Sequence, residues 1–166
     1  MAKSITAASN MSSNAADRAL ITKLQTNVVD FALNSAGLAI KTTGSALAKS
    51  VNTVYAMLDG VLFSKAAADM AALSGTVTNA KFNVFAFTLK ADGTLATTMG
   101  TEGATLAAVV FPTIPASSVV LGFLIVNPTG TGNFVGGTTA LDDATVVPNA
   151  VYVNTPFPFN PNALSL

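Results

Sequence analysis

The 166-residue chain contains no histidine, no cysteine and no tryptophan. Without cysteine it has no disulfide and no thiol chemistry. The common Ser–His and Cys–His nucleophile systems, and zinc sites built from imidazole or thiolate, also lack their principal side chains. The sequence therefore argues against an enzyme, and we expect neither a catalytic residue nor a bound metal or cofactor.

Charged side chains are scarce as well. They make up 10% of the residues, against about 25% in ordinary soluble domains, whereas 51% of the residues are apolar. The formal net charge is zero, and proteins with little net charge tend to associate. We interpret the surface as one that neighbouring proteins cover. The alternative is a self-sufficient domain with a coat of uncharged serine and threonine.

The few charges are unevenly distributed along the chain. Residues 1–90 contain all eight basic residues and four acidic ones, and residues 91–166 contain the other four acidic residues. Oppositely charged halves favour contacts with a second copy or with a partner protein. There is one arginine and no basic cluster, so we expect no nucleic-acid partner.

We divide the chain into residues 1–34, 35–154 and 155–166. Residues 1–13 are rich in alanine, serine and asparagine and predict an arm. Residues 14–34 predict either a helix or an extended continuation of that arm, because several β-branched residues there are poor helix formers. The helical alternative depends on apolar residues that are four, four and three positions apart, namely Leu20, Leu24, Val28 and Phe31.

Residues 35–154 predict a mainly β domain, an antiparallel sandwich or barrel-like structure, because glycines cut this part into short segments. Asp59-Gly60 lies between two β-rich runs and predicts a type I′ hairpin turn. Residues 82–90 are apolar on both faces and predict a central strand. We also expect one helical turn at 66–73, a surface loop at 130–137, and further strands at 53–58, 61–65, 94–99, 106–111, 119–126, 145–147 and 150–154.

The C-terminal residues 155–166 include Pro156-Phe157-Pro158-Phe159. The prolines exclude a helix or a central strand and favour an extended segment. Burial of each phenylalanine is worth about 1.5–3 kcal/mol, so both should dock, either on the parent domain or on a neighbouring subunit. The candidate partner contacts are therefore Leu20, Leu24, Val28, Phe31, Phe157 and Phe159.

The carboxylates offer little chemistry. Asp142-Asp143 is an adjacent pair that we interpret as part of a solvated turn, with a weak calcium site as the alternative. Asp92 and Glu102 could be nominated as a glycosidase pair, but nothing in the sequence supports them. The glycine-rich run 130–137 lacks the Gly-Lys-Ser/Thr ending of a phosphate-binding loop, which argues against a nucleotide site.

We expect no membrane span and no secretion signal. The longest strongly apolar run, 119–126, has eight residues, whereas a spanning helix needs about 20. Residues 1–10 lack the apolar core of a signal peptide. These features predict a protein that is made in the cytoplasm and has no membrane partner.

Four stretches carry a family resemblance. They are Asp59 to Asp69 (DGVLFSKAAAD), Phe82 to Phe87 (FNVFAF), Met99 to Leu106 (MGTEGATL) and Gly122 to Asn154, which includes VNPTGTG and GGTTALDD. In these stretches the chain resembles bacteriophage virion structural proteins that are found with head genes, some of which are assigned as decoration or cement proteins. The resemblance covers most of the chain after Gly37, and its motifs are structural, not catalytic.

The resemblance implies a capsid decoration (cement) protein on the capsid surface of the virion. Such a protein would stabilise the shell by bridging subunits of the major capsid protein, and symmetric closure would make it a homodimer or homotrimer. No small-molecule substrate is implied. The alternative is a head-fibre or tail-associated adhesion protein, although no heptad or fibrous repeat is present. A carbohydrate-binding or hydrolytic β domain is a third hypothesis, which has only Tyr55 and Tyr152 as aromatic platforms besides phenylalanine.

Overall fold

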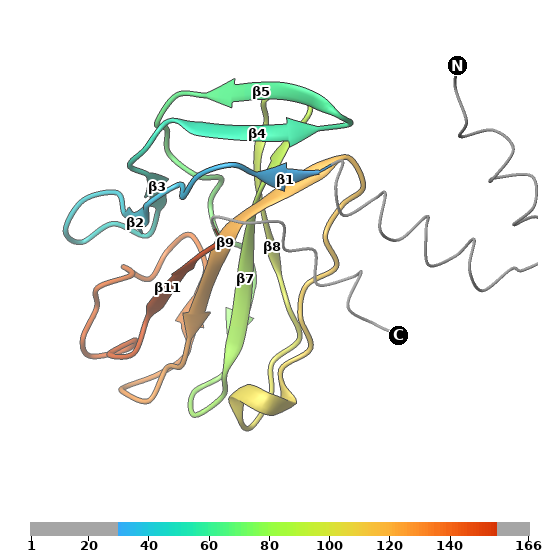
Figure 1. The fold of residues 1–166 in the computed structure, drawn as a ribbon. Helices are drawn as coiled ribbons and strands as arrows, with labels where there is room; N and C mark the ends of the chain where they lie inside the picture. The colour runs from blue at the N-terminus through green and yellow to red at the C-terminus, as the bar shows by residue number, and fades with distance from the viewer. Residues whose placement is uncertain (1–29, 156–166) are drawn as a thin grey trace, which may run out of the picture.

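The computed structural model describes residues 30–155, which are mainly β and form several antiparallel sheets (Figure 1). This confirms the mainly β, sandwich-like domain that the sequence predicts. The described residues form one short 3₁₀-helix, η2 (Leu106–Ala108), and the strands β1 (Phe31–Ala32), β2 (Leu38–Ile40), β3 (Ala48–Ser50), β4 (Val54–Leu58), β5 (Val61–Lys65), β6 (Thr76–Val77), β7 (Asn83–Lys90), β8 (Leu95–Met99), β9 (Ser118–Val126), β10 (Phe134–Val135) and β11 (Val151–Asn154).

A four-stranded antiparallel sheet in the order β11-β9-β7-β8 forms the centre of the domain. Its strand β7 lies between β8 and β9 and is buried over nearly its whole length. Phe85 and Phe87 point into the main core, whereas Val84 and Ala86 pack in a second cluster on the opposite face. The prediction of a central strand that is covered on both faces is therefore confirmed.

A three-stranded sheet, β1-β4-β5, lies across one end of the four-stranded sheet (Figure 1). The two sheets enclose the main core, which combines Val54, Ala56 and Leu58 of β4 with the inward side chains of β7 and β9. Two smaller sheets, β2-β3 and β10-β6, complete the fold. The main core uses one face of each main sheet. The second cluster covers part of the other face of the four-stranded sheet, whereas the other face of the three-stranded sheet is exposed at Tyr55 and Leu62.

The β4-β5 hairpin has the turn that the sequence predicts. Asp59 has a φ of 50° and Gly60 a φ of 76°, and a type I′ turn requires positive φ at both central residues. The amide of Asp59 also donates a 2.7 Å hydrogen bond to the carboxylate of Asp30. Local turn chemistry therefore fixes the register of this hairpin.

A β-bulge in β9 determines which side chains face each side of the four-stranded sheet. Phe87 lies opposite Gly122 and Thr88 opposite Val120, so Leu121 is the extra residue. A Cβ atom at Gly122 would lie 2.6 Å from Leu38 Cδ1 and would collide with the carbonyl oxygen of Val153. Only glycine fits where β11 approaches β9 this closely.

Phe31 corrects part of the N-terminal prediction. It lies in β1 opposite Met57, so the helical alternative is wrong for residues 31–32 and the extended one is correct. The extended backbone places the neighbouring Ala32 in the buried interior beside Ala56. The predicted arm, Leu20, Leu24, Val28, Phe157 and Phe159 lie outside the described residues.

Three further local predictions are wrong. Residues 66–73 are extended, because the amide of Ser50 and the carbonyl of Ala48 bond to Ala68 and Met70 along this segment. Residues 106–111 begin with η2 instead of a strand. Residues 145–147 form a turn that the carboxylate of Asp143 stabilises. Strand β11 is consequently paired with β9 and not with residues 145–147.

No helix within residues 30–155 is long and apolar enough to cross a membrane.

Candidate interaction surfaces

The outer face of the three-stranded sheet is apolar and exposed. Met57 and Leu62 are direct cross-strand partners, and the amide of Leu33 donates a 2.8 Å hydrogen bond to the carbonyl of Tyr55. Residues that lie opposite each other in an antiparallel pair share one face of the sheet. Tyr55 and Met57 are two positions apart on β4, so the Leu33–Tyr55 pair and the Met57–Leu62 pair lie on the same face. We call Leu33, Tyr55, Met57 and Leu62 the outer face.

The outer face is continuous with an open strand edge. Among the described residues β5 pairs with β4 alone, and Figure 1 shows it as the outermost strand of its sheet. An edge strand presents unpaired N–H and C=O groups that can bind another chain. Leu62 is 64% exposed and Val61 67%, and Lys65 at the end of β5 is its one charged residue. An exposed apolar edge of this kind marks an interaction surface.

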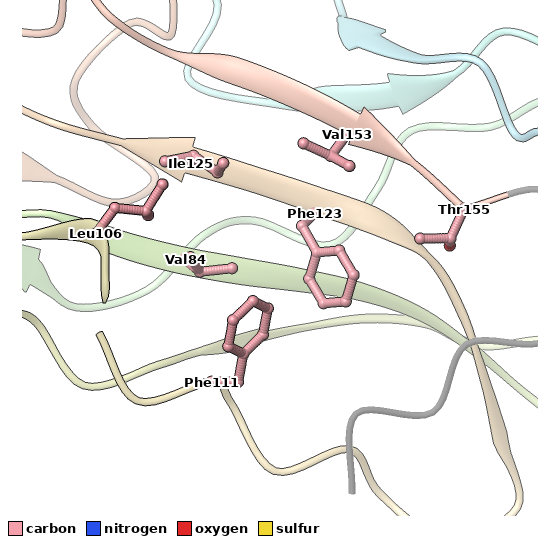
Figure 2. A pocket seen from close by; sticks show the side chains of 7 residues that line it. All are labelled: Val84, Leu106, Phe111, Phe123, Ile125, Val153 and Thr155. Carbon is pink, nitrogen blue, oxygen red and sulfur yellow. The ribbon is translucent and has the colours of Figure 1, made fainter. Parts of the chain in front are cut away.

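A second apolar surface lies on the other side of the domain, on the face of the four-stranded sheet that points away from the main core. Here an outer pocket of about 380 Å³ opens between β9, β11 and the segment around η2 (Figure 2). The rings of Phe111 and Phe123 meet edge to face at 5.5 Å. The pocket is lined by Val84, Leu106, Phe111, Phe123, Ile125, Val153 and Thr155.

The outer pocket has no ionisable lining residue. Its one polar side chain, Thr155, donates a 3.1 Å hydrogen bond to the carbonyl of Val120. Small-molecule sites combine apolar walls with a few precisely placed polar groups, and this pocket presents almost none. Its chemistry therefore suits aromatic or aliphatic side chains.

Asp142 and Asp143 stabilise turns. The carboxylate of Asp142 accepts hydrogen bonds of 3.1 and 3.0 Å from the amide of Gly44. Asp143 accepts bonds from the hydroxyl and the amide of Thr145 at 2.6 and 2.8 Å, and these bonds hold the pKa of Asp143 below its ordinary value. Within residues 30–155 no group of three or more aspartate, glutamate, histidine or cysteine side chains is placed to hold a metal ion.

Asp92 and Glu102 do not form a facing pair. Asp92 lies in the turn between β7 and β8, where the amide of Thr94 donates to it at 2.8 Å and lowers its pKa. Glu102 follows β8 and accepts bonds from the amide and hydroxyl of Thr78 at 2.8 and 3.0 Å. Strand β8 therefore separates the two carboxylates, and each belongs to its own local turn.

The glycine-rich run 130–137 has a structural role. Its residues Phe134 and Val135 form β10, and the fully buried ring of Phe134 meets Phe85 edge to face at 5.9 Å. Gly130 packs directly against the carbonyl of Thr145. The sequence interpretation as a surface loop is therefore wrong for Phe134, which anchors the run in the main core.

Of the predicted contact residues, the structure describes Phe31 alone. It is half-buried and packs against the main core, and as the cross-strand partner of Met57 it lies on the same side of the sheet as the outer face. The exposed Tyr55, Leu62 and Phe111 were not among the predicted contacts. In the sequence these residues lie in runs that are apolar at successive positions. Such a run does not show which face of the strand is buried and which is exposed.

No known protein family, no curated protein and no solved structure matches the chain.

Proposed function

We propose that the chain is a non-enzymatic decoration protein of a bacteriophage capsid. It binds the outer surface of the shell and bridges subunits of the major capsid protein. The observation that carries this proposal is the exposed apolar outer face beside the open edge of β5. The resemblance of four sequence stretches to phage virion proteins gives the proposal its particular partner.

The outer face supplies a suitable driving force. Tyr55 is 49% exposed and Leu62 is 64% exposed, and each Å² of apolar surface that a partner covers contributes about 25 cal/mol. Association costs about 4–15 kcal/mol in lost freedom, so one small patch gives only weak binding. A symmetric oligomer that presents several copies of the patch to a shell multiplies the weak contacts into stable attachment.

The edge of β5 adds direction to this contact. Backbone groups of an open edge pair with an added strand in one register, and alternate side chains then meet pockets on the partner. Because few charged residues lie in this sheet, the selection of a partner depends on shape complementarity and on backbone hydrogen bonds. This combination fits a repeated, rigid protein lattice better than it fits a soluble substrate.

The test is attachment to purified capsids that lack the chain. Leu62→Asp places a charge on the outer face at the open edge formed by β5, and we expect it to reduce capsid occupancy at least tenfold in co-sedimentation. Val135→Asp is the matched control, since Val135 is 41% exposed on the separate β10-β6 sheet, and we expect wild-type occupancy. Equal occupancy of both variants and the wild type would contradict the proposal.

A further inference from the structure

The outer pocket is bounded by the residue at which the described chain ends. Thr155 is part of the pocket wall, and its amide donates a 3.3 Å hydrogen bond to the carbonyl of Leu121. The next four residues in the sequence are Pro156-Phe157-Pro158-Phe159. We propose that the outer pocket is the binding site for this segment of the same chain, and that the two phenylalanine rings fill it.

The segment is long enough to reach every part of the pocket. Strand β11 runs antiparallel to β9, with Val151 opposite Ile125 and Asn154 opposite Gly122. The pocket therefore extends along β9 from the level of Leu121 to Ile125, a distance of about 13 Å for four strand residues. Residues 156–166 can span about 36 Å when extended. They can turn back after Thr155 and lie along the pocket.

The chemistry of the segment matches that of the walls. Six of the seven lining side chains are apolar, and the Thr155 hydroxyl already donates to a carbonyl. A backbone N–H that enters an apolar pocket loses its hydrogen-bond partner. Proline has no backbone N–H, so Pro156 and Pro158 avoid this cost. An incoming phenylalanine also extends the edge-to-face arrangement of Phe111 and Phe123.

Tethering favours the segment of the same chain over that of a second copy. A short linker gives an effective local concentration in the millimolar range, which a second copy reaches only in a concentrated solution or an assembly. Figure 2 shows Val153 and Thr155 along one rim of the pocket, with the ring of Phe123 beside them and the ring of Phe111 next to Phe123. The segment therefore begins at the site that it fills.

A disulfide trap tests this proposal, because the natural chain has no cysteine. The full-length Leu106→Cys/Phe159→Cys variant is prepared as an equal mixture of ¹⁴N- and ¹⁵N-labelled protein and oxidised mildly. We expect linked peptides within one isotope population, at least tenfold above a Val135→Cys/Phe159→Cys control. Leu106 is 46% exposed, so the fold should tolerate its substitution. Mixed-isotope links would assign the pocket to a second copy, and a yield equal to the control would also overturn the proposal.

A second measurement needs no added cysteine. In the Phe157→Ser/Phe159→Ser variant we expect the NMR methyl signals of Val84, Leu106 and Ile125 to shift, whereas those of Leu62 stay unchanged. Unchanged signals for all the pocket residues would overturn the proposal. Neither experiment uses capsids, so its failure would leave the proposed decoration function untouched.

Discussion

Two buried polar residues on β7 differ in how well their hydrogen bonds are satisfied. Asn83 is fully buried; its side-chain amide donates to the carbonyl of Gly100 at 3.1 Å and accepts from the amide of Val84 at 2.7 Å. Thr88 is equally buried, and its hydroxyl has no partner within the described part of the chain. A buried polar group without a partner destabilises the folded state.

We expect Thr88→Val to raise the free energy of unfolding by about 1 kcal/mol, because it removes the unsatisfied hydroxyl and keeps the shape of the side chain. The matched substitution Asn83→Val removes satisfied bonds and should lower it by about 1–3 kcal/mol. Urea denaturation of the two variants measures both changes. Similar destabilisation by both would show that the Thr88 hydroxyl is satisfied after all.

Tyr152 gives the domain a dependence on alkaline pH. Burial, with a smaller contribution from the charge of Asp142, raises the pKa of the Tyr152 phenol from its ordinary value of 10.0 to about 12. Between these values the unfolded chain loses the phenol proton while the folded chain keeps it. The contribution of Tyr152 to stability is therefore complete below about pH 10 and is lost as the pH rises toward about 12.

We expect the midpoint of urea denaturation to fall between about pH 10 and pH 12. This fall should be smaller in the Tyr152→Phe variant, which has no phenol proton to lose at position 152. The Tyr55→Phe variant retains Tyr152 as its one phenol in the chain, so its ultraviolet titration should have a midpoint near 12. A midpoint near 10 in that variant would show that the Tyr152 phenol is not shielded by burial.

Among the elements, the bulge in β9 links the fold to the outer pocket. It lets Leu121 and Leu124 face the main core while Val120 and Phe123 face the other side. The bulge requires glycine at position 122, where Leu38 and the backbone of β11 leave no space for a Cβ atom. Gly122 thus allows the close approach of β9 and β11, and these two strands supply part of the pocket wall.

We expect Gly122→Ala to lower the free energy of unfolding by about 2 kcal/mol or more, since it adds a backbone clash to the strain of a positive φ. Gly132→Ala separates the two effects: Gly132 also has a positive φ, of 97°, but nothing lies within 4 Å of the position of its Cβ. The loss of unfolding free energy in Gly132→Ala should be smaller than that in Gly122→Ala by at least about 1 kcal/mol. Thermal unfolding of both variants gives the comparison, and equal losses would mean that packing at Gly122 is unimportant.

Elements with strong local chemistry were predictable from the sequence. The β4-β5 hairpin follows from Asp59-Gly60, and the central position of β7 follows from its two apolar faces. Elements whose structure depends on distant partners were not. Residues 106–111 have a strand-like composition, yet Thr101 and Val110 form only an isolated bridge there. Strand β11 pairs with residues of β9 that lie 26 to 32 positions earlier.

The candidate surfaces were harder to predict than the fold, for a related reason. Strand β4 is apolar on both faces, so its sequence does not show that Ala56 is buried and Tyr55 exposed. The outer pocket combines Phe111, Phe123 and Val153 from separate segments. A single sequence does not reveal such a combination before the sheet order is known.

At the scale of the whole molecule, the domain has two apolar surfaces on opposite sides of its main core. The outer face belongs to the three-stranded sheet, and the outer pocket lies on the far face of the four-stranded sheet. Within residues 30–155 one ion pair is present, Lys41 with Asp69 at 2.5 Å, and both side chains are well exposed. Surface pairs of this kind contribute little to stability, so apolar contacts dominate both the folding and the proposed attachment.

The most direct test of the proposed function is to locate the domain by cryo-electron microscopy on phage particles to which the purified chain has been added. Density for the domain should lie on the outer surface of the head, across contacts between major capsid protein subunits, with β5 and the outer face of Tyr55 and Leu62 against the shell. Density confined to the tail or to a head fibre, or attachment through another side of the domain, would contradict this account.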